Sequence, residues 1–211
     1  MIVSHTNRFI FVAIPKTGSQ AIRTVLNQHI NANDWQQEDL YDMKRMPFKD
    51  LAKLKHGHVL LREIKPYISQ KTWKDYFKFA FVRNPWDRFI STMSFKFGSN
   101  KIFQSNPLAF MKLCLERPSD GMEVLLRPQH KYVTNEKGDS IVDYLGKFEE
   151  FQNSYDQVCE HIGLETAPLK RVNETSHLHY ADCYDDELKG LISEKYAEDI
   201  RLFGYEFGRS A

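Results

Sequence analysis

The feature that most constrains the fold is a junction between an apolar run and a helical pattern near the start of the sequence. Residues 8–14 are rich in β-branched and aromatic side chains, and Pro15 ends the run. Behind it, apolar residues recur at helical spacing, at Ala21, Ile22, Val25, Leu26 and Ile30. The pattern predicts a strand, a turn over residues 15–20 and a helix.

The predicted turn is suited to an anion. A helix that starts at such a turn presents unpaired N–H groups and the positive end of its dipole, and Lys16 adds a full charge. The alternative is an ordinary connection with a surface lysine. The turn differs from the nucleoside-triphosphate loop, in which a lysine follows two glycines, because Lys16 precedes Gly18, the only glycine of residues 15–20. In the nucleoside-triphosphate loop the order is Gly, then Lys, then a Ser or Thr that supplies a magnesium ligand. That order of residues is missing here, which disfavours a metal-dependent kinase or ATPase.

Length and charge limit the protein classes. The 211 residues are most simply one domain, 1–211, with no repeat or long linker. With 29 basic and 28 acidic residues there is no general basic field, so attraction to nucleic acid or to an anionic membrane is not indicated. Any anion site must therefore be local.

The cysteines and apolar runs predict a cellular setting. Cys114, Cys159 and Cys183 are odd in number and unpaired in spacing, as is typical of free thiols in a reducing compartment. The sequence has no apolar run of the roughly 18 residues that span a bilayer, and no signal-peptide layout at its start. We expect a cytoplasmic protein without a transmembrane segment.

Further along the chain, strand and helix patterns alternate. Strands are predicted at 77–82 and 141–148, and a polar loop with a short helix at 31–55. Helices are predicted at 59–68, 107–116, 151–162 and 188–203, with Gly163 ending the third of them. This alternation is typical of an α/β fold with a largely parallel central sheet flanked by helices.

A second strand-to-helix junction follows the strand at 77–82. Asn84 supplies an N-cap and Pro85 the first helical position, while Arg83 stands at the carboxyl end of the strand. Ser91 lies seven residues after Asn84, on the same helix face. Arg83 and Ser91 can clamp a second phosphate at the sheet edge where ligands of α/β folds bind. The alternative is a surface arginine paired with Asp87 and a serine that faces solvent.

Both junctions resemble a known family, the sulfotransferases that use 3′-phosphoadenosine 5′-phosphosulfate (PAPS), in the branch of carbohydrate 2-O-sulfotransferases and their bacterial relatives. Residues 14–18 are similar to the family's 5′-phosphosulfate loop, and residues 79–91 to its 3′-phosphate motif. The resemblance continues through 142–149, 184–188 and 196–205, and so covers most of the chain. It implies a P-loop-like, three-layer fold and PAPS as co-substrate, without a metal.

The family resemblance implies roles for the residues of both junctions. The phosphosulfate would be held by Pro15, Lys16, Thr17, Gly18, Ser19 and Gln20, and the 3′-phosphate by Arg83 and Ser91. Lys16 would stabilise the charge that grows on the departing phosphate. Lys147 departs from the arginine of many bacterial relatives, which leaves the strength of a contact there open.

Two histidines between the junctions are candidates for a catalytic base. His56-Gly57-His58 resembles the His-Gly-His of the 2-O-sulfotransferases, and His58 aligns with a histidine that precedes an Arg-Glu pair in bacterial relatives. Histidine suits removal of a proton from an acceptor hydroxyl. We expect His58 to be the base, with His56 as the alternative. A surface turn or a metal pair are the other readings of this motif.

The C-terminal part holds weaker signals. His177, His179 and Cys183 could suggest a metal, but their uneven spacing is unlike that of a closed zinc site. The resemblance implies a loop near the nucleotide at 173–176, with Lys170 and Arg171 as further anion contacts. Trp35, Trp73 and Trp86 are expected to serve in packing.

The acceptor is the least constrained part of the prediction. A hydroxyl of a carbohydrate or glycolipid is implied by the family, with specificity in segments 31–55 and 95–135. Candidate contacts to an anionic acceptor are Arg127, Gln129, His130 and Lys131. Two rival functions remain at this point: a phosphotransferase of the P-loop type, and a nucleotide-binding module without turnover.

Overall fold

The structure is a computed structural model that describes residues 1–37, 46–54, 56–169 and 179–208. Its residues form two compact units that alternate along the chain. One unit is drawn from Met1–Val82 and Gln129–Val172, and the other from Arg83–Pro128 and Asn173–Ala211. The single domain predicted for 1–211 stays a prediction.

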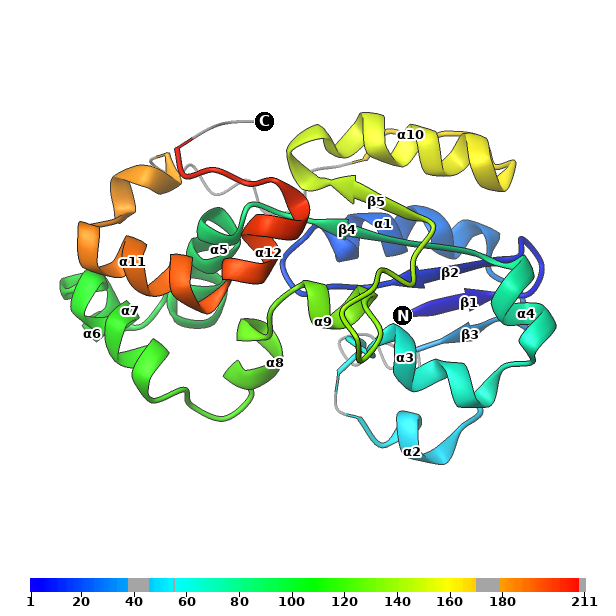
Figure 1. Cartoon of the computed structure of the whole chain (residues 1–211), viewed down its shortest axis with the longest axis horizontal. Helices are drawn as coiled ribbons and strands as arrows, with labels where there is room; N and C mark the ends of the chain where they lie inside the picture. The colour runs from blue at the N-terminus through cyan, green and yellow to red at the C-terminus, as the bar shows by residue number, and fades with distance from the viewer. Residues whose placement is uncertain (38–45, 55, 170–178, 209–211) are drawn as a thin grey trace. The chain divides into compact units, whose positions relative to one another are not determined.

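The first unit is built on a five-stranded sheet in the order β3-β1-β2-β4-β5 (Figure 1). The central strands β2 (Phe9–Val12), β4 (Phe77–Val82) and β5 (Tyr144–Lys147) are parallel. β1 (Ile2–Ser4) pairs antiparallel with both β2 and β3 (Trp35–Gln36). Since β2 and β4 are parallel neighbours, their carboxyl ends lie at one edge of the sheet, where the segments that follow them begin.

Two helices cover one face of this sheet (Figure 1). α1 (Ser19–Leu26) and α10 (Phe151–Ile162) bury their apolar stripes against the aromatic side chains of β2 and β4. Burial of such side chains contributes about 25 cal/mol per Å² of apolar surface, which makes this core the main support of the turn before α1. Its members are Ile2, Phe9, Phe11, Ala13, Ala21, Ile22, Val25, Leu26, Phe79, Phe81, Phe151, Tyr155, Val158 and Cys159.

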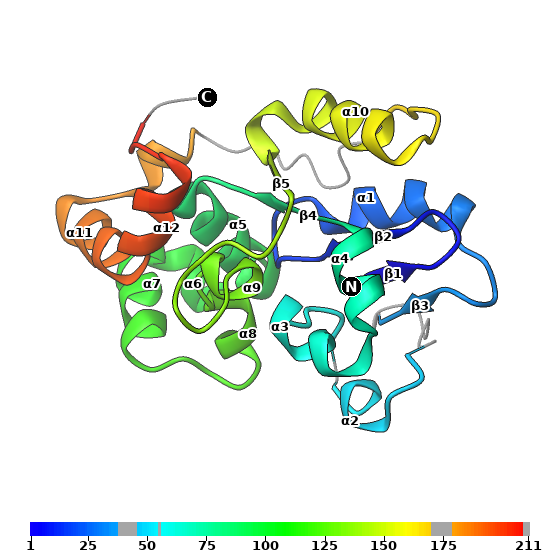
Figure 2. The ribbon, with the colours of Figure 1, turned by 45° about the vertical axis from the view of Figure 1, so that its right-hand side comes forward.

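Shorter helices complete the first unit. α3 (Leu61–Ile64) and α9 (His130–Val133) contact each other and lie on the side of the sheet opposite α10 (Figure 2). The other α-helices in the described part of this unit are α2 (Lys49–Ala52) and α4 (Gln70–Asp75). The α/β class and the flanking helices are thus confirmed.

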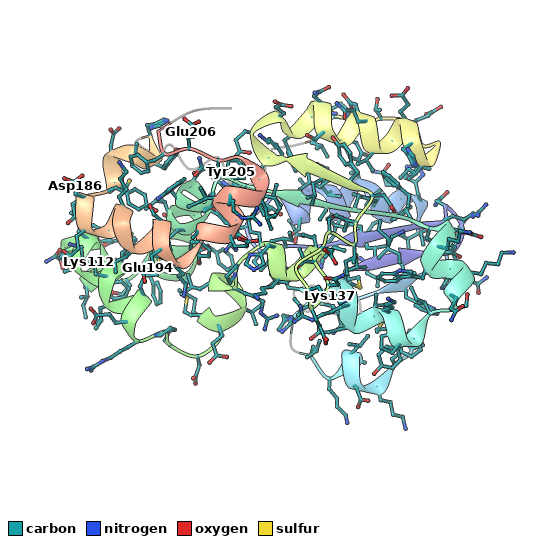
Figure 3. All side chains as sticks on the ribbon, in the orientation of Figure 1. Lys112, Lys137, Asp186, Glu194, Tyr205 and Glu206 are labelled. Atoms are coloured by element: carbon teal, nitrogen blue, oxygen red, sulfur yellow. The ribbon has the colours of Figure 1, made fainter. Side chains whose placement is uncertain are left out.

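The second unit is helical. It contains α5 (Pro85–Phe97), α6 (Lys101–Ser105), α7 (Pro107–Glu116), α8 (Met122–Leu126), α11 (Asp186–Lys195) and α12 (Ala197–Phe203). Lys112 of α7 donates to Asp185 at 2.7 Å and also to Glu187, and Figure 3 labels both Lys112 and Asp186, the first residue of α11. This ion-pair cluster ties α7 to the start of α11. None of the helices among residues 1–37, 46–54, 56–169 and 179–208 is both long and apolar enough to span a membrane.

Several predicted elements differ in extent from the observed ones. The helix predicted at 188–203 is two helices, because the chain turns at Tyr196, whose φ of −113° is outside the helical range. The helix predicted at 59–68 is reduced to α3 and a 3₁₀ turn, Lys65–Tyr67. The strand predicted at 141–148 is limited to β5. The antiparallel strands β1 and β3 were not predicted, because runs of three and two residues carry no periodicity.

Candidate active site

The turn between β2 and α1 forms the base of the candidate site. Gly18 is the N-cap of α1 in a left-handed conformation, and no side chain among the described residues caps the helix. The first turn of α1 contains no acidic residue. The N–H groups there and the positive end of the helix dipole are therefore suited to an anion, and the anion site at this turn stays a prediction.

Lys16 has an uncommon backbone conformation. Its φ is 65°, in the left-handed region that residues with a Cβ rarely adopt and that costs about 1–2 kcal/mol. Non-glycine residues in this region are concentrated at functional sites, where the surrounding structure maintains the strain. A lysine is thus held here despite a conformation that would favour glycine.

The other residues of the turn have different environments. Pro15 and Thr17 are buried, whereas Ser19 and Gln20 are partly exposed. The Thr17 hydroxyl donates to the carbonyl of Ile14 at 3.1 Å, so its proton is used inside the turn. Thr17 is therefore expected to offer its backbone, not a hydroxyl proton, to a ligand.

Gly18 is required by both its conformation and its surroundings. Its φ is 78°, and a Cβ at this position would lie 2.8 Å from Cε2 of Phe151 and closer still to Cζ. Phe151 belongs to the core beneath the turn. The turn thus lies directly against the aromatic core.

Replacing Gly18 with alanine should destabilise the protein. We expect a loss of about 1–3 kcal/mol from the contact with Phe151 and about 1–2 kcal/mol from the left-handed backbone. Urea unfolding measures the loss. Gly163→Ala is the matched control, since Gly163 has a φ of 72° and no atom within 4 Å of its Cβ position. Equal losses in the two variants would show that the close approach to Phe151 has no energetic weight.

His58 is fastened to the same turn. Its Nδ1 lies 2.8 Å from the carbonyl oxygen of Ala13, three residues before Lys16. A carbonyl only accepts, so Nδ1 carries the proton, and the neutral ring has a lone pair on Nε2. Burial, together with the positive charge of Arg23, lowers the pKa of His58 to about 3, although part of the residue remains accessible to solvent. At neutral pH the ring is therefore uncharged and able to accept a proton.

His56 has the opposite arrangement of protons. The backbone N–H of His58 donates to Nδ1 of His56 at 3.3 Å, so the proton of a neutral His56 ring is on Nε2. The two ring centroids are 6.3 Å apart. Of the two histidines, only His58 presents a lone pair at Nε2, which distinguishes the residues where their spacing alone could not.

Arg83 is the first residue of the second unit, and Ser91 lies within its helix α5. The Arg83 guanidinium makes a two-pronged ion pair with Asp87, with Nε and Nη2 at 2.7 and 2.9 Å from the carboxylate oxygens. The contact named above as the alternative is therefore present. This ion pair is compatible with a phosphate-binding role for Arg83. A guanidinium has five N–H donors, and the ion pair holds the group in one orientation. Ser91 lies on α5 and is partly exposed.

Other candidates named from the sequence are only partly described. Lys170, Arg171, residues 173–176 and His177 lie outside the described residues. His179 and Cys183 are described, and the described residues contain no group of three or more His, Cys, Asp or Glu side chains that could hold a metal ion. The absence of a metal from the reaction stays a prediction.

The acceptor candidates are placed in a short segment. Arg127 directly follows α8, and Gln129 is fully buried ahead of α9, which contains His130 and Lys131. A buried Gln129 is unsuited to direct contact with a large acceptor. No observation tests the other three.

Comparison with known proteins decides the family. The sequence model of the group described as "Sulfotransferase family" matches residues 1–206. The chain belongs to the sulfotransferase family. This match includes both the turn at 15–20 and the junction at Arg83, and it confirms the P-loop-like class implied by the resemblance.

One curated relative supports the carbohydrate branch of the sulfotransferases. Carbohydrate sulfotransferase 14 of Danio rerio is 22% identical over 237 residues, which cover 97% of this chain and 62% of the relative. The chain thus spans less than two thirds of that protein's length. No solved structure matches the chain.

Sequence reasoning missed two features of the candidate site. The Ala13 carbonyl, which sets the proton positions of His58, is a backbone atom with no signature in the sequence. The strain at Lys16 is also invisible in the residue type, although its place two residues before Gly18 marked the turn as unusual.

Proposed function

We propose that this sulfotransferase transfers the sulfuryl group of PAPS to a hydroxyl of a carbohydrate or glycolipid acceptor. The observation that carries the proposal is the hydrogen bond between His58 and Ala13, which holds a neutral base next to an anion-binding turn. PAPS supplies the sulfuryl group, whose bond to a phosphate oxygen breaks as a bond to the acceptor oxygen forms. The family assignment favours this reaction over the phosphotransferase considered above.

His58 is the proposed base for the acceptor. Its Nε2 lone pair takes the hydroxyl proton as the acceptor oxygen becomes bonded, which can contribute about 10²–10⁴-fold to the rate. With a pKa of about 3 it is a weak base in the free protein. The negative charges of a bound nucleotide would raise that pKa and so strengthen the base when the donor is present.

His56 is proposed to act as a hydrogen-bond donor. Because its Nε2 carries the proton, it suits an oxygen atom of the acceptor or of the sulfuryl group, not proton removal. This role assigns the two histidines different functions in one reaction.

Lys16 and the start of α1 are proposed to hold the phosphosulfate. The Lys16 ammonium and the N–H groups at residues 17–20 stabilise the charge that grows on the departing phosphate. The leaving group is 3′-phosphoadenosine 5′-phosphate. Because the interaction strengthens as charge develops, it stabilises the transition state more than the ground state.

The acceptor class rests on the relative's name and on the family resemblance. A screen for sulfate transfer from PAPS to polysaccharides, glycolipids and small alcohols would identify it. Transfer of phosphate from ATP, or nucleotide binding without transfer to any acceptor, would contradict the proposed reaction.

Arg83→Ala should weaken binding of 3′-phosphoadenosine 5′-phosphate. Loss of hydrogen bonds to a charged group costs about 1.5–3 kcal/mol, or about 10- to 100-fold in Kd, measured by calorimetry. Asp87→Asn is the control, because it removes the negative charge that pairs with Arg83 but keeps the guanidinium. If both variants lose affinity equally, Arg83 acts only through its ion pair and is not a phosphate ligand.

A further inference from the structure

Arg23 is a buried charged residue that the proposed reaction does not use. It lies on α1, four residues after Ser19, and is only 4% exposed. Arginine is rarely buried to this extent without a specific partner. Arg23 lies one helical turn beyond the start of α1, so its partner shows which other segment is anchored near residues 15–20.

The guanidinium of Arg23 reaches the turn that contains both histidines. Its Nη2 donates to the carbonyl oxygen of Gly57 at 3.0 Å, and the Met1 nitrogen donates to the same oxygen at 2.6 Å. Gly57 stands between His56 and His58. The peptide that joins the two histidines is therefore held by a charged donor, and such hydrogen bonds are stronger than neutral ones.

Close contact with Arg23 explains the glycine of the His-Gly-His motif. A Cβ on Gly57 would lie 2.5 Å from Nη2 and 2.8 Å from Nη1 of Arg23, and would also collide with the carbonyl oxygen of Gln37. Any side chain at this position would move the turn away from the guanidinium. The close approach of the Arg23 guanidinium therefore requires glycine at position 57.

The His-Gly-His turn, residues 56–58, is held by residues on both sides of the predicted anion-binding turn at 15–20. The His58 ring is fixed by Ala13, just before residues 15–20, and the preceding peptide is fixed by Arg23, just after them. Because the two restraints come from Ala13 and Arg23, which flank the turn at 15–20 on either side, the location of His58 is tied to that of Lys16. A base must lie within hydrogen-bond reach of the proton it removes, so such restraints matter for rate.

We propose that Arg23 is a positioning residue that fixes the His-Gly-His turn and thereby places Nε2 of His58 relative to the phosphosulfate turn. The proposal rests on the proposed function in so far as His58 is the base. Arg23 acts through the Gly57 carbonyl and touches neither donor nor acceptor. Its positive charge, with His56 and the Met1 amino group, also disfavours a proton on His58.

Kinetics of Arg23→Ala test the catalytic part of this inference. Misplacement of a base by about 1 Å can cost about 10²-fold, so we expect kcat to fall by about 10- to 100-fold. The KM for PAPS and the Kd for 3′-phosphoadenosine 5′-phosphate should stay near the native values. Ethylguanidinium should restore part of the lost rate by filling the vacated position. Arg201→Ala is the control, because Arg201 is an exposed helical arginine paired with Glu198.

Nuclear magnetic resonance of ¹⁵N-labelled histidine tests the structural part without any assay of activity. The native protein should show His58 neutral and protonated at Nδ1 from pH 7 down to pH 5. In Arg23→Ala and in Gly57→Ala this signature should be replaced by a mixture of proton positions, while Arg23→Lys should retain it in part.

The outcomes separate this inference from the proposed function. An unchanged His58 signature in a folded Arg23→Ala protein would overturn the inference, whether or not sulfate is transferred. A parallel rise in the KM for PAPS would also overturn it, since Arg23 would then act on the donor. If no acceptor is sulfated but the signature changes as expected, the positioning role stands and the proposed reaction fails. If Arg23→Ala does not fold, Arg23→Lys and Gly57→Ala decide by the same two measurements.

Discussion

His58→Ala should lower kcat by about 10²–10⁴-fold and leave the affinity for 3′-phosphoadenosine 5′-phosphate nearly unchanged. The physical reason is that Nε2 of His58 is the acceptor for the hydroxyl proton, while the nucleotide is held by the turn at 15–20. Steady-state kinetics and calorimetry on the same preparation measure the two effects. With its pKa lowered to about 3, His58 should stay unprotonated between pH 8 and pH 5 in the nucleotide-free protein, so kcat/KM for PAPS, which reports on groups of the free enzyme, should not fall there through its titration.

His56→Ala is the matched control for this prediction. Because its ring is a donor at Nε2, its removal should cost one hydrogen bond, about 0.5–1.5 kcal/mol, or at most about tenfold in rate. The opposite result, with His56→Ala inactive and His58→Ala active, would reverse the assignment of the base.

Lys16→Ala should lower kcat by about 10²–10³-fold, the usual loss when a group that stabilises developing negative charge is removed. The KM for PAPS should rise less than kcat falls, because the lysine acts most strongly in the transition state. Rates measured at saturating PAPS separate the two quantities.

Lys16→Gly provides a second, independent readout. Since the φ of 65° suits glycine, this variant should lose the same rate but gain about 1 kcal/mol in stability over Lys16→Ala. If Lys16→Gly is instead the less stable of the two in urea unfolding, the left-handed backbone at Lys16 is not a source of strain.

The parts of the fold that the sequence predicted well are those with long periodic patterns. The strand at 77–82, the helix at 107–116 and the helix at 151–162 with Gly163 at its end all match the structure. Their apolar residues recur often enough to specify one period, and proline or glycine marks a boundary. β1 and β3 are too short to do so, and their order in the sheet depends on contacts with β2.

The candidate site could be predicted only as far as residue types reveal it. Lys16, Gly18 and the histidine pair stood out because charge, backbone freedom and titration near neutrality are properties of single residues. The difference between His56 and His58 depends on which atoms each Nδ1 meets, and Arg23 looked like one polar residue on an amphipathic helix. Such relations arise only when distant segments fold together.

β5 is synthesised well after β4, its neighbour in the sheet, and this order affects folding during translation. β4, with the sequence Phe-Lys-Phe-Ala-Phe-Val, pairs with β2 on one side and with Tyr144–Lys147 on the other. During translation at about 5–20 residues per second, the outer edge of β4 therefore stays without its partner for several seconds. The unpaired N–H and C=O groups of such a strand edge can form hydrogen bonds with strands of other nascent chains. We therefore expect the yield of folded protein to depend on chaperone supply more than its stability once folded would suggest.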